Sequence, residues 1–187
     1  SSQRSSQPMA VSSSAAPTLN VVNATDSTRL QGATFSGALT GGVAGGTAFI
    51  KAVLGTLALT GGAGNTFGSG GSVIDIQNGV LSAPNVASLG NSGNVILLNP
   101  GAGLVATFRA SGNMTLDAAT TPSLKFGSLD SSAARRIEVT AGTTLTLNSA
   151  IDVALAPGAA LQKNDAGTLV LTQAQTGYTG AITVNQG

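Results

Sequence analysis

The chain of 187 residues contains no cysteine, no histidine and no tryptophan, and it has a single tyrosine. Without cysteine and histidine it cannot build a disulfide framework, a cysteine nucleophile, a Ser-His-Asp triad, a haem–histidine bond or a zinc site of the usual ligands. Charged residues are also scarce, at 8% against roughly 25% in a typical soluble domain. These absences favour a structural, binding or assembly protein over an enzyme.

The few charges that remain are balanced and scattered. Eight Lys and Arg against seven Asp and Glu give a net charge of +1, which is too little to form a nucleic-acid-binding surface, so we expect no nucleic-acid partner. No apolar run approaches the roughly 20 residues that span a bilayer. The acidic residues form no pair at strand spacing, as a β-helical polysaccharide lyase or hydrolase would need. We therefore expect no catalytic residue, no cofactor and no metal ion.

Short alternating segments recur about every ten residues and predict β-strands. In each, Leu, Ile or Val occupies one face and Thr, Asn or a charged residue the other. The clearest are residues 56–60, 114–117, 136–140, 143–148 and 168–172. Clusters rich in glycine and asparagine separate them and predict turns. No segment shows helical periodicity, so the fold class is all-β.

An internal repeat selects among the all-β architectures. Residues 51–60 read KAVLGTLALT and residues 163–172 read KNDAGTLVLT. Each copy continues with an aromatic residue, a short strand and a Gln-Asn-Gly or Asn-Gln-Gly end. In a solenoid equivalent positions stack on one another, so the same residue types return, whereas each strand of a sandwich has its own neighbours. The shared positions are Lys51, Gly55, Leu57, Leu59, Phe67 and Gly79 in the first copy, and Lys163, Gly167, Leu169, Leu171, Tyr178 and Gly187 in the second.

The repeat predicts one β-solenoid domain over residues 28–187, with repeat copies at 47–82 and 158–187. At about 20 to 25 residues per coil, roughly seven coils fit, each rising by one strand spacing of about 4.8 Å. Narrow coils explain the composition, because tight inward positions exclude tryptophan, corners favour glycine, and like charges stacked at strand spacing repel. Residues 1–27 are rich in serine and alanine, and we expect an extended segment that pairs with a neighbouring subunit.

Several conspicuous residues have two interpretations each. Lys51 and Lys163 could contact a ligand, but we expect solvated lysines at strand ends that block edge pairing. Phe67 and Tyr178 could form a platform for a carbohydrate, but we expect each to cover a coil corner. The adjacent pair Arg135 and Arg136 could contact an anionic surface, but Glu138, two residues beyond, favours a local ion pair.

The blocks at residues 49–61, 65–68 and 71–81, and the second copy at 161–187, resemble the autotransporter-associated β-strand repeat. Phe67 stands where that repeat usually has tyrosine, and residues 173–175 read Gln-Ala-Gln where it has Gly-Ala-Asn. The resemblance implies a right-handed parallel β-helix, exported to the extracellular space or bacterial cell surface. It also implies that the repeated residues are structural, so no catalytic residue carries over.

Two functions follow as expectations. The first is a structural subunit or stalk that assembles head to tail through open solenoid ends and the N-terminal segment, or continues within a longer chain, and serves adhesion or a biofilm matrix. The second is a passenger-type adhesin that binds glycan or another surface through its Thr- and Asn-rich faces. A β-helical carbohydrate enzyme is a third class, but the sequence lacks its clustered carboxylates.

Overall fold

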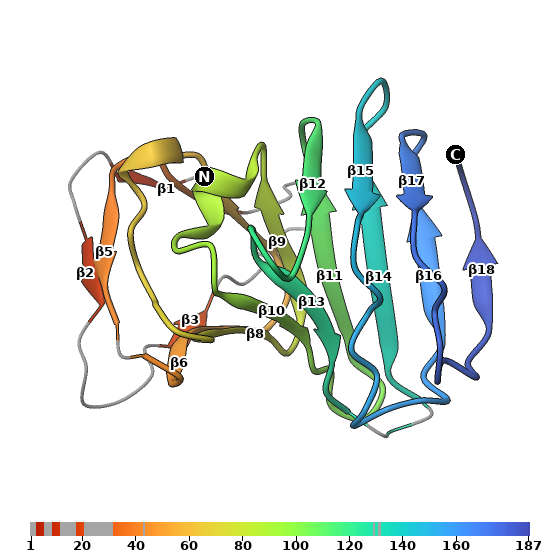
Figure 1. Cartoon of the computed structure of the whole chain (residues 1–187). Helices are drawn as coiled ribbons and strands as arrows, with labels where there is room; N and C mark the ends of the chain where they lie inside the picture. The colour runs from red at the N-terminus through yellow and green to blue at the C-terminus, as the bar shows by residue number, and fades with distance from the viewer. Residues whose placement is uncertain are drawn as a thin grey trace.

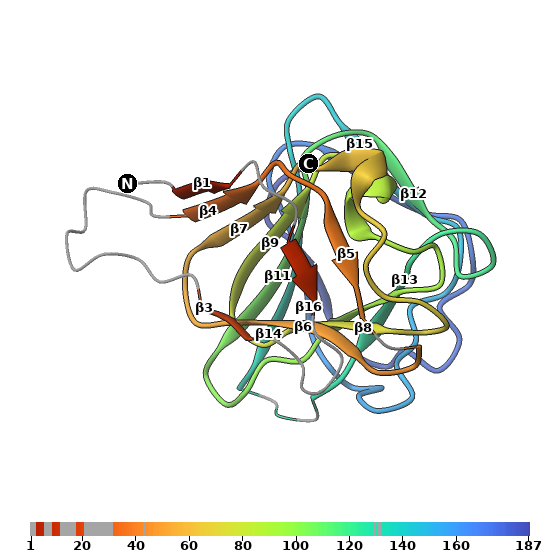
Figure 2. The same cartoon turned by 90° about the vertical axis from the view of Figure 1, so that its left-hand side faces the viewer.

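The computed structural model describes residues 3–5, 9–11, 18–20, 32–42, 44–128, 130 and 132–187. These residues form an all-β parallel β-solenoid without an α-helix (Figure 1). Every strand pairing is parallel, which confirms the expected fold class. Seen from the N-terminal end, successive turns follow one closed outline with three sides (Figure 2).

The first side is one continuous eight-stranded sheet and the second a five-stranded sheet. The first consists, in spatial order, of β1 (Gln3–Ser5), β4 (Gly32–Phe35), β7 (Thr56–Leu59), β9 (Gly79–Ala83), β11 (Val105–Ala110), β14 (Ala134–Val139), β16 (Leu161–Asn164) and β18 (Ile182–Val184). The second consists of β3 (Thr18–Asn20), β6 (Thr47–Ala52), β8 (Val73–Ile76), β10 (Val95–Leu98) and β13 (Ser123–Phe126).

The third side changes its structure along the solenoid. It begins with the strand pair β2 (Met9–Val11) and β5 (Leu39–Gly41) and ends with the sheet β12 (Met114–Leu116), β15 (Thr144–Leu147) and β17 (Thr168–Leu171). Between them lie two short 3₁₀ segments, η1 (Gly62–Gly64) and η2 (Val86–Leu89). Asn65 joins this middle part to both neighbours, because its side chain accepts a hydrogen bond from Leu39 N and donates one to Ser88 O.

Successive turns differ in length, and about five of them are complete. Gly32 pairs with Thr56, 24 residues later, whereas Val105 pairs with Ala134, 29 residues later. The roughly seven coils that we expected therefore correspond to the passes through the first side, while the second side has a strand in only five turns.

The described strands of residues 1–27 begin the solenoid of their own chain. Three of them, β1, β2 and β3, pair in parallel with β4, β5 and β6. We expected this segment to pair with a neighbouring subunit, and these three strands instead extend the sheets of the chain to which they belong. The rest of the segment lies outside the described residues.

The core is a set of side-chain columns that run along the solenoid. On the first side, Leu57, Leu81, Phe108 and Ile137 lie in register, and all four are fully buried. On the second side, Ile76, Leu98 and Phe126 form a similar column. This is the alternation that the sequence predicted, because every second residue of a strand points inward.

Candidate functional site

The best-defined polar site in the described solenoid is a corner built around Lys51. Its side chain is fully buried and lies in line with Ile76 of the next turn. Lys51 Nζ donates hydrogen bonds to the carbonyl oxygens of Ala52, at 3.1 Å, and Val53, at 2.7 Å. A third bond, of 2.8 Å, reaches the carbonyl of Asn78 in the next turn. One ammonium group therefore holds the corner between β6 and β7 to the turn that follows.

Lys163 builds the same corner in the second repeat copy. Its exposed fraction is 3%, and its Nζ donates to the carbonyl oxygens of Asn164, at 3.0 Å, and Asp165, at 2.6 Å. The third bond again reaches the following turn, at Gln186 O, 2.9 Å away. The two corners share their number of bonds, their order along the chain and their link between turns.

The backbone explains why each corner needs a buried cation. Val53 and Asp165 hold φ angles of 59° and 62° and are the only non-glycine residues with positive φ among those that the structure describes. This left-handed conformation turns two consecutive carbonyl groups toward the inside of the corner. Buried carbonyl oxygens without a donor are costly, and a lysine on the inward face supplies three N–H groups from one atom.

Our expectation that Lys51 and Lys163 are solvated strand-end residues is therefore wrong. Each occupies an inward position, two residues beyond the buried Phe49 or Leu161. The alternation of the strand showed this inward phase, but we assigned the lysines to solvent because of their charge. Burial lowers the pKa of Lys51 from 10.5 to about 8, and it also lowers the pKa of Lys163.

A glycine of the next turn covers each lysine. Gly79 has a φ of 74°, and a Cβ atom there would lie 2.6 Å from Gly55 O and 2.8 Å from Lys51 Nζ. Gly187 has a φ of 105°, and a Cβ there would lie 2.5 Å from both Gly167 O and Lys163 Nζ. Any side chain would collide with the corner, which explains why both copies end on glycine.

The two copies differ in the leucines that follow the corner. Leu57 and Leu59 of β7 are fully buried, since β7 lies between β4 and β9. In β17, Leu171 is 36% exposed and Leu169 is only half-buried. The reason is that β17 is the last strand of its sheet, and among the described residues no strand lies beyond it.

The two copies also lie on different sides of the solenoid, which corrects our stacking argument. Lys51 belongs to the second side and the leucines that follow it to the first, whereas Lys163 belongs to the first side and its leucines to the third. The copies therefore do not stack on each other. The repeat encodes a corner that recurs at different positions around the coil.

The aromatic residues of the two copies have different surroundings. Phe67 is fully buried, and its ring centroid lies 5.5 Å from that of Phe49, so it is a core residue and not a carbohydrate platform. Tyr178 is partly buried, lies edge-on to Phe126 at 6.2 Å and donates its hydroxyl to Ala181 O at 3.0 Å. Tyr178 thus covers a bend of the chain, as expected.

The predicted ion pair of Arg135–Arg136 with Glu138 is wrong. Glu138 instead accepts from Arg109 of the preceding turn at 2.7 Å, and Arg136 donates to Gln162 of the next turn at 3.1 Å. Arg135 is a third buried cation, with bonds to the carbonyls of Ser128 and Ala133. Sequence reasoning missed it, although its alternation with Ile137 signals an inward position.

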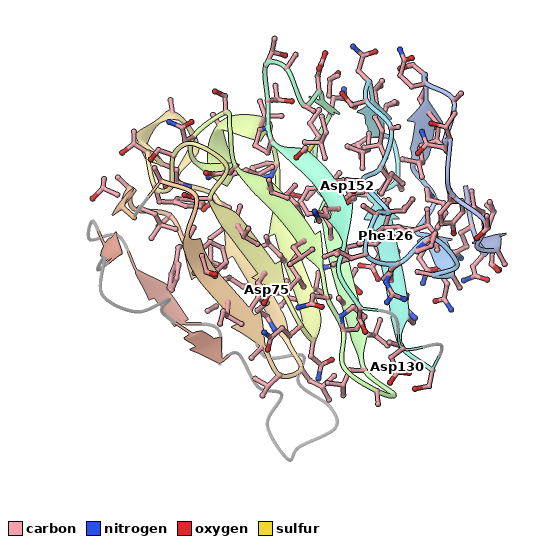
Figure 3. All side chains as sticks on the ribbon, turned by 60° about the horizontal axis from the view of Figure 1, so that its bottom comes forward. Asp75, Phe126, Asp130 and Asp152 are labelled. Carbon is pink, nitrogen blue, oxygen red and sulfur yellow. The ribbon has the colours of Figure 1, made fainter. Side chains whose placement is uncertain are left out.

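The acidic residues do not converge. Figure 3 shows Asp75, Asp130 and Asp152 on separate parts of the ribbon, and Asp152 is paired with Lys125 at 2.8 Å. Asp75 is half-buried, and burial raises the pKa of its carboxyl. Over the residues that the structure describes, no group of three or more acidic side chains could hold a metal ion, and no helix is long and apolar enough to cross a membrane.

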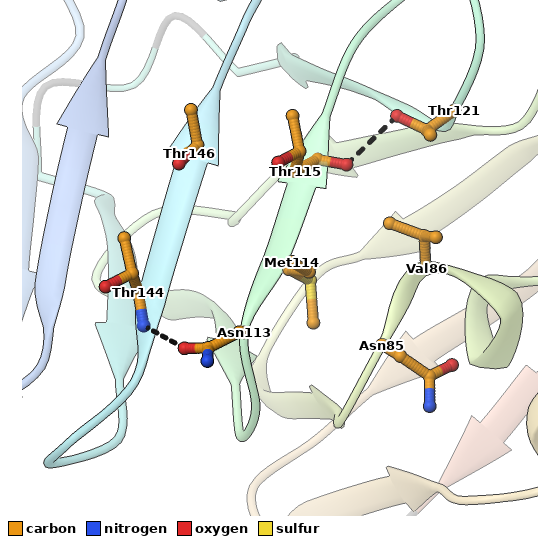
Figure 4. A pocket seen from close by; sticks show the side chains of 8 residues that line it. All are labelled: Asn85, Val86, Asn113, Met114, Thr115, Thr121, Thr144 and Thr146. Atoms are coloured by element: carbon orange, nitrogen blue, oxygen red, sulfur yellow. Dashed lines mark hydrogen bonds between the residues drawn. The ribbon is translucent and has the colours of Figure 1, made fainter.

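A shallow groove on the third side collects uncharged polar side chains (Figure 4). Thr115 and Thr146 are register partners on neighbouring strands, and Thr144 N donates to Asn113 Oδ1 at 2.8 Å. Only β15 contributes a Thr-x-Thr pair, since its register partner in β17 at Thr146 is Val170. The threonine row therefore does not extend regularly over three turns.

A second groove, of about 340 Å³, lies at the C-terminal edge and is mostly apolar. Its lining consists of Lys163, Thr168, Leu169, Leu171, Ile182, Val184 and Gly187. Ile182 and Val184 are 47% and 60% exposed, because β18 has a partner strand on one side only. The groove thus joins the second lysine corner to the open edges of the last two strands.

Comparison of the chain with models of protein families, with curated proteins and with solved structures finds no match in any of the three. The β-solenoid fold therefore stands on the coordinates, and the resemblance to the autotransporter-associated repeat stands on the quoted residues alone.

Proposed function

We propose that this chain is a structural, non-enzymatic β-solenoid of the bacterial cell surface or extracellular space. It extends end to end as a fibre or stalk, in an adhesive or biofilm-matrix role. The observation that carries the proposal is the exposed apolar edge of the last turns, where Leu171, Ile182 and Val184 lie beside unpaired strand edges. Open edges of this kind promote association unless they are covered.

The direction of the strands supports head-to-tail contact. All pairings are parallel, so a second copy stacked on the C-terminal edge continues the sheets without reversing any strand. Such a contact joins two different surfaces and does not close, which generates a filament. The uniform backbone ladder supplies mechanical strength without any chemistry, in agreement with the scattered carboxylates.

Electron microscopy and sedimentation of the purified chain test this proposal. We expect filaments of regular width, and we expect the double variant Ile182→Asp with Val184→Asp to remain monomeric with an unchanged circular dichroism spectrum. Both side chains are exposed, so the variant should fold. Single particles of the parent chain at high concentration would contradict head-to-tail assembly.

The groove of threonines and asparagines supports the second candidate, an adhesin that binds an uncharged glycan. A glycan array tests it, with Thr115→Val and Thr146→Val as the variants. These substitutions keep the shape of the side chains and remove two hydroxyl groups from the groove. Glycan binding that the valines leave unchanged would place the ligand elsewhere.

A further inference from the structure

We propose that the open edge of β17 is a docking site for one extended strand of a partner polypeptide with the pattern x-Leu-x-Ala. The strand adds in parallel to β17 as β9 adds to β7. This inference rests on the proposed end-to-end extension and names what closes the joint. A second copy stacked with its β1 against β18 leaves one strand position open beside β17, because the first side is already one strand ahead of the third.

The first repeat copy shows what a covered corner looks like. Val80 N donates to Gly55 O at 3.0 Å, and Leu81 lies opposite Leu57. Leu57 and Leu81 are both fully buried, and Gly79 lies over the lysine corner. Residues 80–83, which read Val-Leu-Ser-Ala, therefore close this corner with one leucine, one alanine and a parallel backbone ladder.

The second copy repeats every part of that arrangement up to the covering strand. Thr172 N donates to Leu147 O at 3.1 Å, as Thr60 N donates to Phe35 O at 2.8 Å, so the strands have the same orientation. Gly187 lies over Lys163 as Gly79 lies over Lys51.

The backbone of β17 has hydrogen-bonding groups that point to the open edge. Thr168 N and Thr172 N donate to β15, so the alternate residues, Leu169 and Leu171, direct their N–H and C=O groups away from it. A strand added there gains main-chain hydrogen bonds and covers the two leucines.

The first copy also fixes the register and the chemistry of the occupant. Gly187 already fills the place of Gly79, so the docked strand begins one position later, and its second residue lies opposite Leu169. That residue is leucine in the template, and the fourth is alanine. The groove accepts no charge at the second position, since Leu169, Leu171 and Ile182 line it and Lys163 Nζ already has three acceptors.

A fluorescent peptide with the sequence of residues 79–90 tests the inference on the full chain. We expect saturable binding by fluorescence anisotropy and slower hydrogen exchange at the amides of Leu169 and Leu171. The peptide with Leu81→Asp should bind at least about tenfold more weakly, since a charge would enter the apolar groove.

Two chain variants on the same strand provide the matched control. Leu171→Asp places a carboxylate in the groove and should weaken binding by at least about tenfold, whereas Val170→Asp lies on the outward face and should change it by less than about threefold. Equal binding by both variants, absence of saturable binding, or exchange protection outside β17 would overturn the inference.

The outcomes separate this inference from the proposed function. Peptide binding by a chain that never forms filaments would refute end-to-end assembly and keep the docking site. Filaments formed by a chain that does not bind the peptide would refute the docking site and keep the assembly.

Discussion

The two lysine corners of this solenoid have nearly identical sequences and opposite surroundings. In the first copy the strand after the corner is covered on both edges, and Leu57 and Leu59 are fully buried. In the second copy the equivalent Leu169 and Leu171 reach solvent at the last strand of their sheet. The corner therefore forms without a cover on its following strand, since the lysine, the left-handed residue and the covering glycine supply its bonds locally. What the cover adds is the burial of the two leucines.

The largest expected difference between the copies is in the response of these leucines to charge. Leu59→Asp would place a carboxylate in the closed core, which should cost about 4 kcal/mol or more and prevent folding under mild conditions. Leu171→Asp keeps its charge in contact with water and should cost less than about 1 kcal/mol. Urea unfolding followed by circular dichroism measures both.

Equal destabilisation by the two substitutions would contradict the open edge. It would mean that β17 is as well covered in solution as β7, for example by a second copy. Repeating the measurement at several protein concentrations separates these cases, because only a covered edge makes the effect of Leu171→Asp depend on concentration.

The lysines provide the next contrast. Lys51→Met keeps most of the side-chain volume but leaves three carbonyl groups without a donor, one of them fully inside the molecule, and should cost about 2 to 3 kcal/mol. Lys163→Met removes three bonds that lie closer to solvent, where water can replace the donor, so the expected cost is below about 1 kcal/mol.

Urea midpoints of the two methionine variants, compared with the parent chain, measure this contrast. A loss at Lys51 no greater than at Lys163 would show that the ammonium group is not what holds the first corner. Lys125→Met is a suitable control, since Lys125 is exposed at the surface and makes a single ion pair with Asp152.

The sequence was sufficient for the fold because the solenoid obeys local rules. The alternating strands at 114–117, 143–148 and 168–172 are all present, and so is the turn at Asp165. The order Gly-Thr-Leu-x-Leu-Thr after a lysine predicts the corner wherever it occurs. These features depend on neighbours along the chain, so a single sequence contains them.

The fate of the charged residues could not be predicted in the same way. Whether Lys51 is solvated or buried depends on carbonyl groups that a turn 27 residues later supplies through Asn78. Glu138 chose Arg109, 29 residues away, over Arg136 beside it, because stacked strands place them in register. Partner choice across turns requires the length of each turn, and these lengths vary from 21 to 29 residues.

The smallest expected effect is on pH dependence, and it again distinguishes Lys51. Burial lowers its pKa from 10.5 to about 8 in the folded chain, so between these values the unfolded chain binds more protons. The free energy of unfolding should therefore rise as the pH increases from about 8 toward 10.5, and the full cost of burying the charge applies below that window. The gain is partial, because a neutral amine has two N–H groups for three carbonyls. Burial raises the pKa of Tyr178, which opposes the trend at the alkaline end. Subtracting the unfolding free energy of Lys51→Met from that of the parent chain at pH 7.5, 9 and 10 isolates the lysine. A difference that stays constant or falls with pH would show that the three carbonyl groups keep the ammonium charged in the folded state.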